Sequence, residues 1–259
     1  MAGNYNVKEE MQKIDAGLSG LTRVLDGEVW NLSTQIQSKL SLFSEAVLEQ
    51  NLSMNLTAIT DGDEFLIKHL QDSLSLLEIA ERFGLDQSGK DRSLSFLDMG
   101  SGPGFPGLPL AIMRPDWHIV LLDSLKKRVD FLNRVIGNLG LENVKAIHGR
   151  AEDLGRQKNC RESFDLVTAR AVASLPVLLE LTLPLVKLSG TFLAMKGSDD
   201  EVEEAANACR ILGGSFTGGV DLALPRDMGQ RNILLYKKVK ATPKAYPRKA
   251  GTPNKKPLI

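Results

Sequence analysis

Cysteine is scarce in this sequence: Cys160 and Cys209 are the only two among 259 residues. They lie far apart and have no His or Cys at metal-ligand spacing, so neither a disulfide framework nor a zinc site is supported, and no metal is expected. Long apolar runs are lacking too, because none reaches the roughly 18 residues that a membrane span requires. The N-terminus lacks the charged and then apolar pattern of a signal peptide. We therefore expect a cytoplasmic protein without a membrane partner.

The formal net charge is zero, but this neutrality is the sum of opposite parts. Residues 1–93 carry 8 Lys and Arg against 15 Asp and Glu, whereas residues 237–259 carry 8 against none. The basic C-terminal end suggests an anionic partner, although such a tail can also serve only to keep a protein in solution.

Hydrophobic periodicity divides the first part of the chain. Residues 1–30 show little of it, and we expect an N-terminal extension that is loosely ordered or forms short helices. From Asn31 to Leu52 and from Asp63 to Phe83, apolar residues recur every three to four positions. This spacing predicts two amphipathic helices within a helical region over residues 31–93.

Strand-like and helix-like segments then alternate, which predicts a doubly wound α/β sheet of parallel strands joined by right-handed crossovers. The expected strands are 94–98, 118–122, 144–148, 164–169 and 190–196, and the expected helices are 107–113, 124–138, a short one after Arg150, 175–186 and 199–212. Two further β-rich runs, 215–224 and 232–239, predict a closing antiparallel hairpin. We expect this Rossmann-like domain to span residues 94–240, with a basic tail over 241–259.

The segment from Asp98 to Gly107, Asp-Met-Gly-Ser-Gly-Pro-Gly-Phe-Pro-Gly, lies where the first strand turns into a helix. Its glycines let the backbone approach a ligand and adopt positive φ, while its prolines stiffen the turn. A strand, a glycine turn and a helix in this order indicate a nucleotide-cofactor site.

The same segment satisfies G-x-G-x-x-G, so a dinucleotide oxidoreductase has to be considered. In that fingerprint the pyrophosphate lies on the helix N-terminus, and the residues before the first glycine are apolar. Asp98 would repel a pyrophosphate but attract a cation. S-adenosylmethionine has a sulfonium, an amino group and no phosphate, and therefore fits better.

Asp123 ends the second expected strand, 20-odd residues beyond the glycine turn. It can accept hydrogen bonds from both ribose hydroxyls of either cofactor. Alternatively, it caps the helix that begins near Ser124.

Several sequence blocks resemble a known family. The glycine segment and the terminal hairpin are similar to those of class I S-adenosylmethionine-dependent methyltransferases. The closer resemblance is to the small-subunit ribosomal RNA guanine-N7 methyltransferases, the glucose-inhibited division protein B family. It covers residues 31–259 and is carried by Asn55-Leu-Thr, His69-Leu-Gln-Asp-Ser-Leu, Asp98 to Leu110, Leu122-Asp-Ser-Leu-Lys-Lys-Arg, Ala169-Arg-Ala-Val-Ala and Tyr246 to Leu258.

The resemblance implies S-adenosylmethionine as cofactor, with Ala151 and Glu152 near the adenine and Arg170 as a cofactor or active-site contact. Their positions agree, because they follow the third and fourth strands at the carboxyl edge of the sheet. Glu152 can alternatively be a first-turn acid that the helix dipole favours. The full expected cofactor site comprises Asp98, Gly100, Gly102, Gly104, Phe105, Asp123, Ala151, Glu152 and Arg170.

Methyl transfer to guanine N7 needs no base, because the N7 lone pair attacks directly and no proton leaves that atom. We therefore expect no catalytic acid or base, since positioning alone can supply roughly 7 to 11 kcal/mol. Pocket candidates are His69, Asp72, Arg170 and Lys196, of which the first two can equally be exposed or satisfied locally. Candidate RNA contacts are Lys126, Lys127, Arg128, Arg170, Lys196, Arg231, Arg248, Lys249, Lys255 and Lys256, with Tyr246 available to stack or pack.

The implied partner is small-subunit ribosomal RNA or the 30S subunit. A class I methyltransferase that acts on a small molecule or a protein is the main alternative, since the fold does not fix the acceptor. A dinucleotide oxidoreductase and a non-enzymatic RNA-binding module are further alternatives, the last weakened by the intact cofactor loop.

Overall fold

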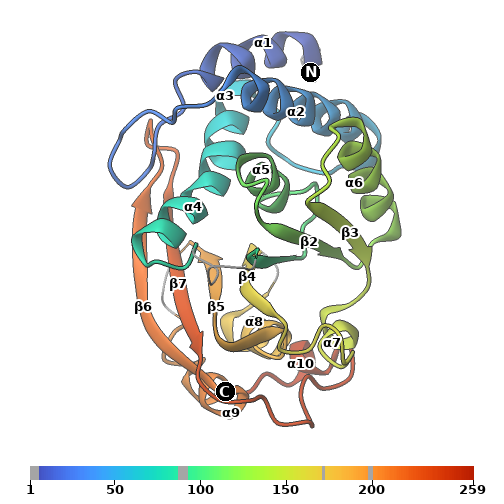
Figure 1. Ribbon diagram of the computed structural model, residues 1–259, viewed down its shortest axis with the longest axis vertical. Helices are drawn as coiled ribbons and strands as arrows, with labels where there is room; N and C mark the ends of the chain where they lie inside the picture. Colours follow the sequence, from blue (N-terminus) through green and yellow to red (C-terminus); the bar gives the residue numbers. More distant parts are fainter. Residues whose placement is uncertain (1–5, 87–92, 171–172, 198–200) are drawn as a thin grey trace.

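The computed structural model describes residues 6–86, 93–170, 173–197 and 201–259 (Figure 1). Parts of four predicted segments lie outside these ranges. They are the first residues of the expected extension, part of the loop after Phe83, Ala171 and Val172 of the Ala169 block, and the start of the helix expected from Asp199. Among the described residues, no helix is long and apolar enough to cross a membrane.

One seven-stranded sheet forms the centre of the molecule, in the order β3-β2-β1-β4-β5-β7-β6. Strands β1 to β5 are parallel, and β7 runs antiparallel between β5 and β6. This topology confirms the predicted fold class, a Rossmann-like sheet closed by an antiparallel hairpin. The strands are β1 Ser95–Met99, β2 His118–Asp123, β3 Val144–His148, β4 Phe164–Arg170, β5 Val186–Lys196, β6 Gly214–Ala223 and β7 Gln230–Lys238.

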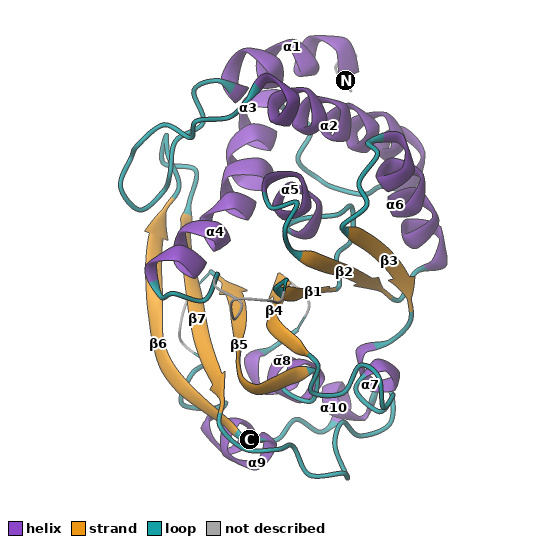
Figure 2. Ribbon diagram, viewed as in Figure 1, coloured by secondary structure: helices purple, strands orange, loops and turns teal. Residues whose placement is uncertain are grey.

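Helices cover both faces of the sheet and bury a separate apolar cluster on each (Figures 1 and 2). One face carries the N-terminal helices together with α5 and α6, and the other carries α8 and α9. The helices are α1 Val7–Leu18, α2 Thr34–Met54, α3 Gly62–Phe65, the π-helix η1 Leu66–Gln71, α4 Asp72–Arg82, α5 Gly107–Met113, α6 Lys126–Asn138, α7 Ala151–Leu154, α8 Leu175–Thr182, α9 Ala206–Leu212 and α10 Thr252–Lys255.

Parallel register brings the carboxyl ends of the central strands to one edge. Met99 of β1 is paired with Leu122 of β2 and with Ala169 of β4. Asp123 and Arg170, the last residues of β2 and β4, therefore lie at the same edge of the sheet, on the two sides of β1. Such an edge is where open α/β sheets bind ligands.

Helix α1 lies within the region for which the sequence predicted either loose order or short helices. Its apolar side is part of the core, with Ile14 fully buried. The backbone N–H of Gly62 donates to Glu10 Oε2 at 2.7 Å, and a Cβ on Gly62 would lie 2.4 Å from the Glu10 carbonyl oxygen. Glycine at position 62 therefore allows α1 and α3 to pack closely.

Several element boundaries differ from the sequence prediction. The helix predicted over residues 199–212 is limited to α9, because residues 201–205 form turns. The single helix expected over Asp63 to Phe83 contains the π-helix η1, which pattern reading does not distinguish from α-helix. Helix α8 ends at Thr182 and β5 begins at Val186, although the apolar run there predicted helix to residue 186. A short apolar run fits a buried helix and a buried strand equally well, and pairing of Val186 with Phe164 in β4 selects the strand.

Candidate functional site

Asp98 lies under the glycine loop and is fully enclosed. Its Oδ2 accepts a hydrogen bond from the Gly107 N–H at 3.0 Å, whereas its Oδ1 has no hydrogen-bond partner among the described residues. Burial raises the pKa of Asp98 to about 7, against the opposing effect of the Gly107 hydrogen bond. An unpaired buried carboxylate oxygen is costly unless a proton or a cation compensates it.

Asp123 holds the glycine loop and the turn into α6. Its Oδ2 accepts from the Gly102 N–H at 2.9 Å, and its Oδ1 accepts from the Leu125 N–H at 2.8 Å. Arg128 Nη1 lies 3.6 Å from Oδ2. The capping alternative was wrong: α6 begins at Lys126 with Leu125 as its N-cap residue and no side-chain cap. Asp123 instead holds the turn before the helix and the glycine loop that begins at Gly100.

Phe105 directs its side chain into the N-terminal helices. Its ring stacks on His69 with a centroid separation of 4.5 Å and an interplanar angle of 9°, and it also contacts Phe43 at 4.9 Å. The residue is buried. The glycine loop is therefore tied to the N-terminal helices through this stack, and the Phe105 side chain acts in packing.

Gly104 has a packing role as well. Its φ is +112°, and a Cβ there would lie 2.8 Å from Leu108 Cδ1 and 3.0 Å from Leu132 Cδ2. Glycine is needed because both the backbone conformation and the space exclude a side chain.

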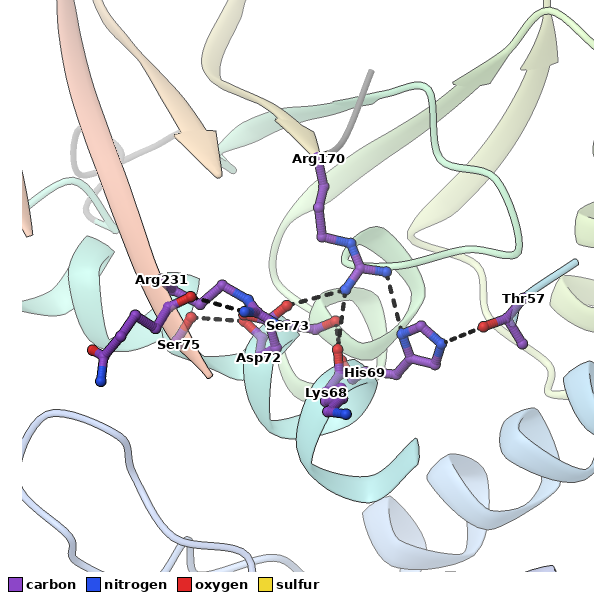
Figure 3. A network of polar contacts seen from close by, with 9 residues as sticks. Thr57, Lys68, His69, Asp72, Ser73, Ser75, Arg170 and Arg231 are labelled. Carbon is purple, nitrogen blue, oxygen red and sulfur yellow. Dashed lines mark hydrogen bonds and ion pairs between the residues drawn. The ribbon is translucent and has the colours of Figure 1, made fainter. Parts of the chain in front are cut away.

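A charged network links the N-terminal helices with the ends of β4 and β7 (Figure 3). Arg170 Nη1 lies 3.2 Å from Asp72 Oδ2, and Arg231 Nε lies 3.1 Å from Asp72 Oδ1. The Asp72 side chain is 1% exposed, whereas those of the two arginines are 19% and 26% exposed. One buried carboxylate therefore fixes two guanidinium groups that remain open to solvent on one side. Arg231 reaches it because β7 begins at Gln230, earlier than predicted.

His69 joins this network as a neutral ring. Its Nδ1 accepts from Arg170 Nη2 at 3.4 Å, because a guanidinium has only donors. The proton therefore sits on Nε2, which lies 2.8 Å from Thr57 Oγ1 and donates to it. Burial, and then the nearby charge of Arg170, lower the pKa of His69 to about 3. His69 and Asp72 are thus buried and partnered over long range, not exposed.

Two cavities open beside these groups at the carboxyl edge of the sheet. The first has a volume of about 410 Å³ and is lined by Lys68, His69, Asp72, Arg170, Lys196 and Arg231, among others. The second has a volume of about 220 Å³, and its lining includes Gly100, Ala151, Glu152, Leu181 and Asn254. The pocket candidates predicted from the sequence share the first cavity, and three of the predicted cofactor residues share the second.

The candidate RNA-binding residues separate into two groups. Lys126, Lys127, Lys249, Lys255 and Lys256 are exposed. Arg248, in contrast, is held by Glu180 of α8: its backbone N–H and its Nε lie 2.8 Å and 2.9 Å from Glu180 Oε1. Arg248 is therefore a structural anchor, and the Tyr246 carbonyl has a similar role because it accepts from Arg161 Nη1 at 2.8 Å.

Comparison with known proteins gives a consistent result. The model of the rRNA small subunit methyltransferase G family, GidB, matches residues 36–221. The chain is 49% identical to ribosomal RNA small subunit methyltransferase G of Desulforamulus reducens over 82% of this chain and 86% of that one. With the protein of the same name from an Exiguobacterium species, the identity is 45% over 93% and 99%.

This chain belongs to the rRNA small subunit methyltransferase G family. Among solved structures, it is similar to a SAM-dependent methyltransferase from Aquifex aeolicus, with a TM-score of 0.47, 16% identity, and coverage of 63% of this chain and 89% of that one.

Three residues that line the second cavity or hold its lining segment were not predicted from the sequence. Asn254 lines the second cavity, and Glu180 and Arg161 hold the segment that carries it. Glu180 left a signal, because it is a lone acid within an otherwise apolar helix, Leu175–Thr182. The signal for Asn254 was its place in the Tyr246 to Leu258 block of the family resemblance, because a polar residue between prolines and lysines is otherwise typical of an exposed tail. Within the described ranges, no group of three or more His, Cys, Asp and Glu is arranged to hold a metal ion.

Proposed function

We propose that this protein transfers a methyl group from S-adenosylmethionine to N7 of a guanine in 16S ribosomal RNA. Membership in the rRNA small subunit methyltransferase G family supports ribosomal RNA as the substrate. The structural observation that carries the proposal is the pair of cavities at one sheet edge, one beside the glycine loop and one lined by four basic side chains.

The residues present fit a cationic, phosphate-free cofactor. Asp98 offers an unpaired buried oxygen beside the loop, and a cation would compensate the carboxylate charge there. We propose that the adenosyl group lies in the second cavity, which is lined by Gly100, Ala151 and Glu152 at the carboxyl edge of the sheet. S-adenosylmethionine, when bound, supplies an electrophilic methyl group on a sulfonium. Asp123 would keep the loop in place and can still accept from a ribose hydroxyl, because each carboxylate oxygen has a second lone pair.

The first cavity would hold the acceptor nucleotide. Its lining includes Lys68, Arg170, Lys196, Arg231 and the acid Asp72. Lys68 and Lys196 also pair with Glu64 and Glu201 outside the lining, so four cations face three acids and the net charge is positive. Guanidinium groups fixed by a buried carboxylate are preorganised to bind phosphate oxygens. These side chains would orient the nucleotide so that the N7 lone pair points at the methyl group. The transfer would exchange the C–S bond of bound S-adenosylmethionine for the new N–C bond, with S-adenosylhomocysteine as the leaving group and the positive charge on the purine ring.

Exposed lysines extend this positive surface. Lys126 and Lys127 begin α6 directly after the end of β2, and Lys255 and Lys256 lie at the end of α10 beside the second cavity. We propose these residues as contacts to the RNA backbone, with Lys249 as a further candidate.

Methyl transfer to a modified RNA tests the acceptor atom. Small-subunit RNA, naked or within the subunit, is incubated with the protein and labelled S-adenosylmethionine, and the labelled nucleoside is identified. We expect 7-methylguanosine, and no label when guanosine is replaced by 7-deazaguanosine, which lacks the attacking nitrogen. Inosine keeps N7 and is the matched control. Label in the 7-deaza RNA would contradict the proposal.

The salt dependence of acceptor binding distinguishes RNA from the alternative, a small-molecule or protein acceptor. Neutralised phosphates make RNA binding fall steeply with salt concentration, whereas a small neutral acceptor shows little dependence. Lys255→Gln combined with Lys256→Gln should weaken RNA binding and reduce the salt slope by roughly two. A wild-type protein whose acceptor binding does not depend on salt would favour the alternative, whereas an unchanged slope in the variant would exclude only Lys255 and Lys256 as phosphate contacts. Deleting the whole tail does not give this distinction, because the tail also packs against the protein body.

A further inference from the structure

The C-terminal segment is folded onto the protein body by specific contacts. Arg161 donates to the carbonyl oxygens of Tyr246 and Thr242 at 2.8 Å and 2.7 Å. Arg248 and Glu180 form a bidentate pair in which the Glu180 side chain is 1% exposed. Buried charge-assisted hydrogen bonds of this kind restrain a segment strongly. The tail therefore has a defined course, which a merely solubilising tail would lack.

That course leads to the second cavity. After the Arg248 anchor, the backbone N–H of Gly251 donates to Glu152 Oε1 at 3.0 Å. Gly251 has a φ of +79°, which turns the chain into α10. The next residues place buried Pro253 against the body and exposed Asn254 at the cavity rim. In Figure 1, α10 lies beside α8 and close to α7.

The hydrogen bond from Gly251 gives Glu152 a second role, which is to hold the tail. Glu152 was expected near the adenine; the residue is 6% exposed, and its carboxylate accepts a hydrogen bond from the tail backbone. An acid that lines the cavity therefore also positions the tail segment that contributes Asn254 to the same lining. The helix-dipole alternative explains an acid in the first turn of α7, but it does not explain a bond to residue 251.

We propose that segment 251–256 forms one wall of the adenosyl pocket and that the Asn254 side chain hydrogen-bonds the adenosine part of the cofactor. The inference rests on the proposed function, because it takes S-adenosylmethionine as the ligand of this cavity. An amide side chain carries both a donor and an acceptor, which matches the donors and acceptors of adenine and ribose. Asn254 is thus a specificity residue for the cofactor, and the adjoining lysines remain free for RNA.

A contact to adenosine affects every ligand that carries it. S-adenosylmethionine, S-adenosylhomocysteine and methylthioadenosine should all lose affinity by the same factor when Asn254 is replaced. A contact to the methionine end would spare methylthioadenosine, and a contact to RNA would change only the KM for RNA.

Calorimetric titration of the full chain with these three ligands tests the inference. For Asn254→Ala we expect a Kd about tenfold higher for each ligand, the loss of one hydrogen bond, at an unchanged melting temperature. Asn207→Ala is the matched control: Asn207 Nδ2 binds the terminal Ile259 carbonyl at 3.0 Å, so it loosens the same tail away from the cavity. We expect this control to bind like the wild type.

The outcomes separate the two proposals. Wild-type protein that binds neither S-adenosylmethionine nor S-adenosylhomocysteine overturns the proposed cofactor, and the inference with it. Wild-type protein that binds both, with Asn254→Ala equally tight, overturns the inference alone. An equal loss for Asn254→Ala and Asn207→Ala also overturns it, because the effect would then come from tail mobility and not from a contact.

Discussion

Arg170 and Asp72 are 98 residues apart in the sequence, yet Arg170 Nη1 lies 3.2 Å from Asp72 Oδ2. The pair joins the end of β4 to the first residue of α4, and Arg231 completes it from the start of β7. Three segments of the chain thus meet on one buried carboxylate at the edge of the larger cavity. Substitutions in this cluster and in the nearby glycine loop should therefore change the stability of the protein and its affinity for the cofactor.

Replacement of Asp72 by Asn keeps the shape but removes the charge that the two guanidinium groups share. Loss of one partner of a buried pair costs several kcal/mol, and partial exposure of both arginines reduces this to about 1 to 3 kcal/mol. We expect a melting temperature lower by roughly 3 to 10 °C and a lower kcat. Asp63→Asn is the control, because Asp63 and Arg226 pair in the open, at 45% and 62% exposure. Melting of both variants at the wild-type temperature would show that the network contributes no stability.

Cofactor affinity should depend on the ionisation of Asp98. Its raised pKa of about 7 means that the free protein keeps the carboxyl protonated below that pH. A cation binds the ionised form better, so the Kd for S-adenosylmethionine should fall as pH rises from 5.5 to 7.5, by at most about tenfold per pH unit below 7. Asp98→Asn should bind more weakly and lose this dependence. A variant with the same pH profile as the wild type would assign the dependence to another group.

His69 should make the folded state sensitive to acid. Its pKa is lowered to about 3 in the folded protein, so the unfolded chain takes up a proton below about 6.5 while the folded chain does not. The stability that a neutral His69 contributes is therefore present above pH 6.5 and is lost as pH falls towards 3.

Urea unfolding at pH 7 and pH 5 measures this effect. Between these values the His69 contribution to wild-type stability should fall by up to about 2 kcal/mol, and His69→Gln should remove that part of the change. Asp98 titrates with the opposite sign in this range, because its raised pKa favours folding as pH falls. The difference between variant and wild type, and not the wild-type slope itself, is therefore the quantity to compare. His148→Gln, at an exposed position, is the control.

Gly107 should not tolerate a side chain. A Cβ there would lie 2.2 Å from Leu121 Cδ2 and 2.9 Å from Asp98 Oδ2. We expect Gly107→Ala to lose about 1 to 3 kcal/mol of stability through overpacking and to bind S-adenosylmethionine poorly, because the loop must move away from Asp98. Gly137→Ala provides the contrast. Position 137 is exposed, and a Cβ there would meet no atom within 4 Å beyond its chain neighbours and its own helix backbone, so helix propensity should raise stability by about 0.5 to 1 kcal/mol. Calorimetry of both variants measures the two effects.

Elements with strong periodicity or turn chemistry could be predicted from the sequence. The range of β3, residues 144–148, and that of α5, residues 107–113, coincide with the structure. Both are short segments bounded by Gly, Asn or Pro, where local signals agree with the tertiary fold. The boundary between α8 and β5 was wrong because an apolar run carries no period that separates buried helix from buried strand.

The difference between what local signals indicate and what tertiary contacts decide also applies to the residues of the candidate site. The positions of Asp98, Asp123 and Arg170 at the carboxyl edge of the sheet could be predicted, because each lies at or next to the end of a parallel strand and such strands share one edge. Arg248 was proposed as an RNA contact from its charge alone, and the structure shows it bound to Glu180. Net charge in a sequence does not reveal which cations have buried partners.

By itself, the sequence determined the sheet, the glycine loop between β1 and α5, and the family, because these depend on local patterns and on motifs in a fixed order. Only the tertiary structure decided that Asp72 binds two arginines from distant strands, that His69 stacks on Phe105, and that the tail reaches the cavity beside Glu152. These contacts join segments from about 36 to 159 residues apart. The physical reason is that such pairing is fixed by the packing of the whole core, and no local pattern encodes it.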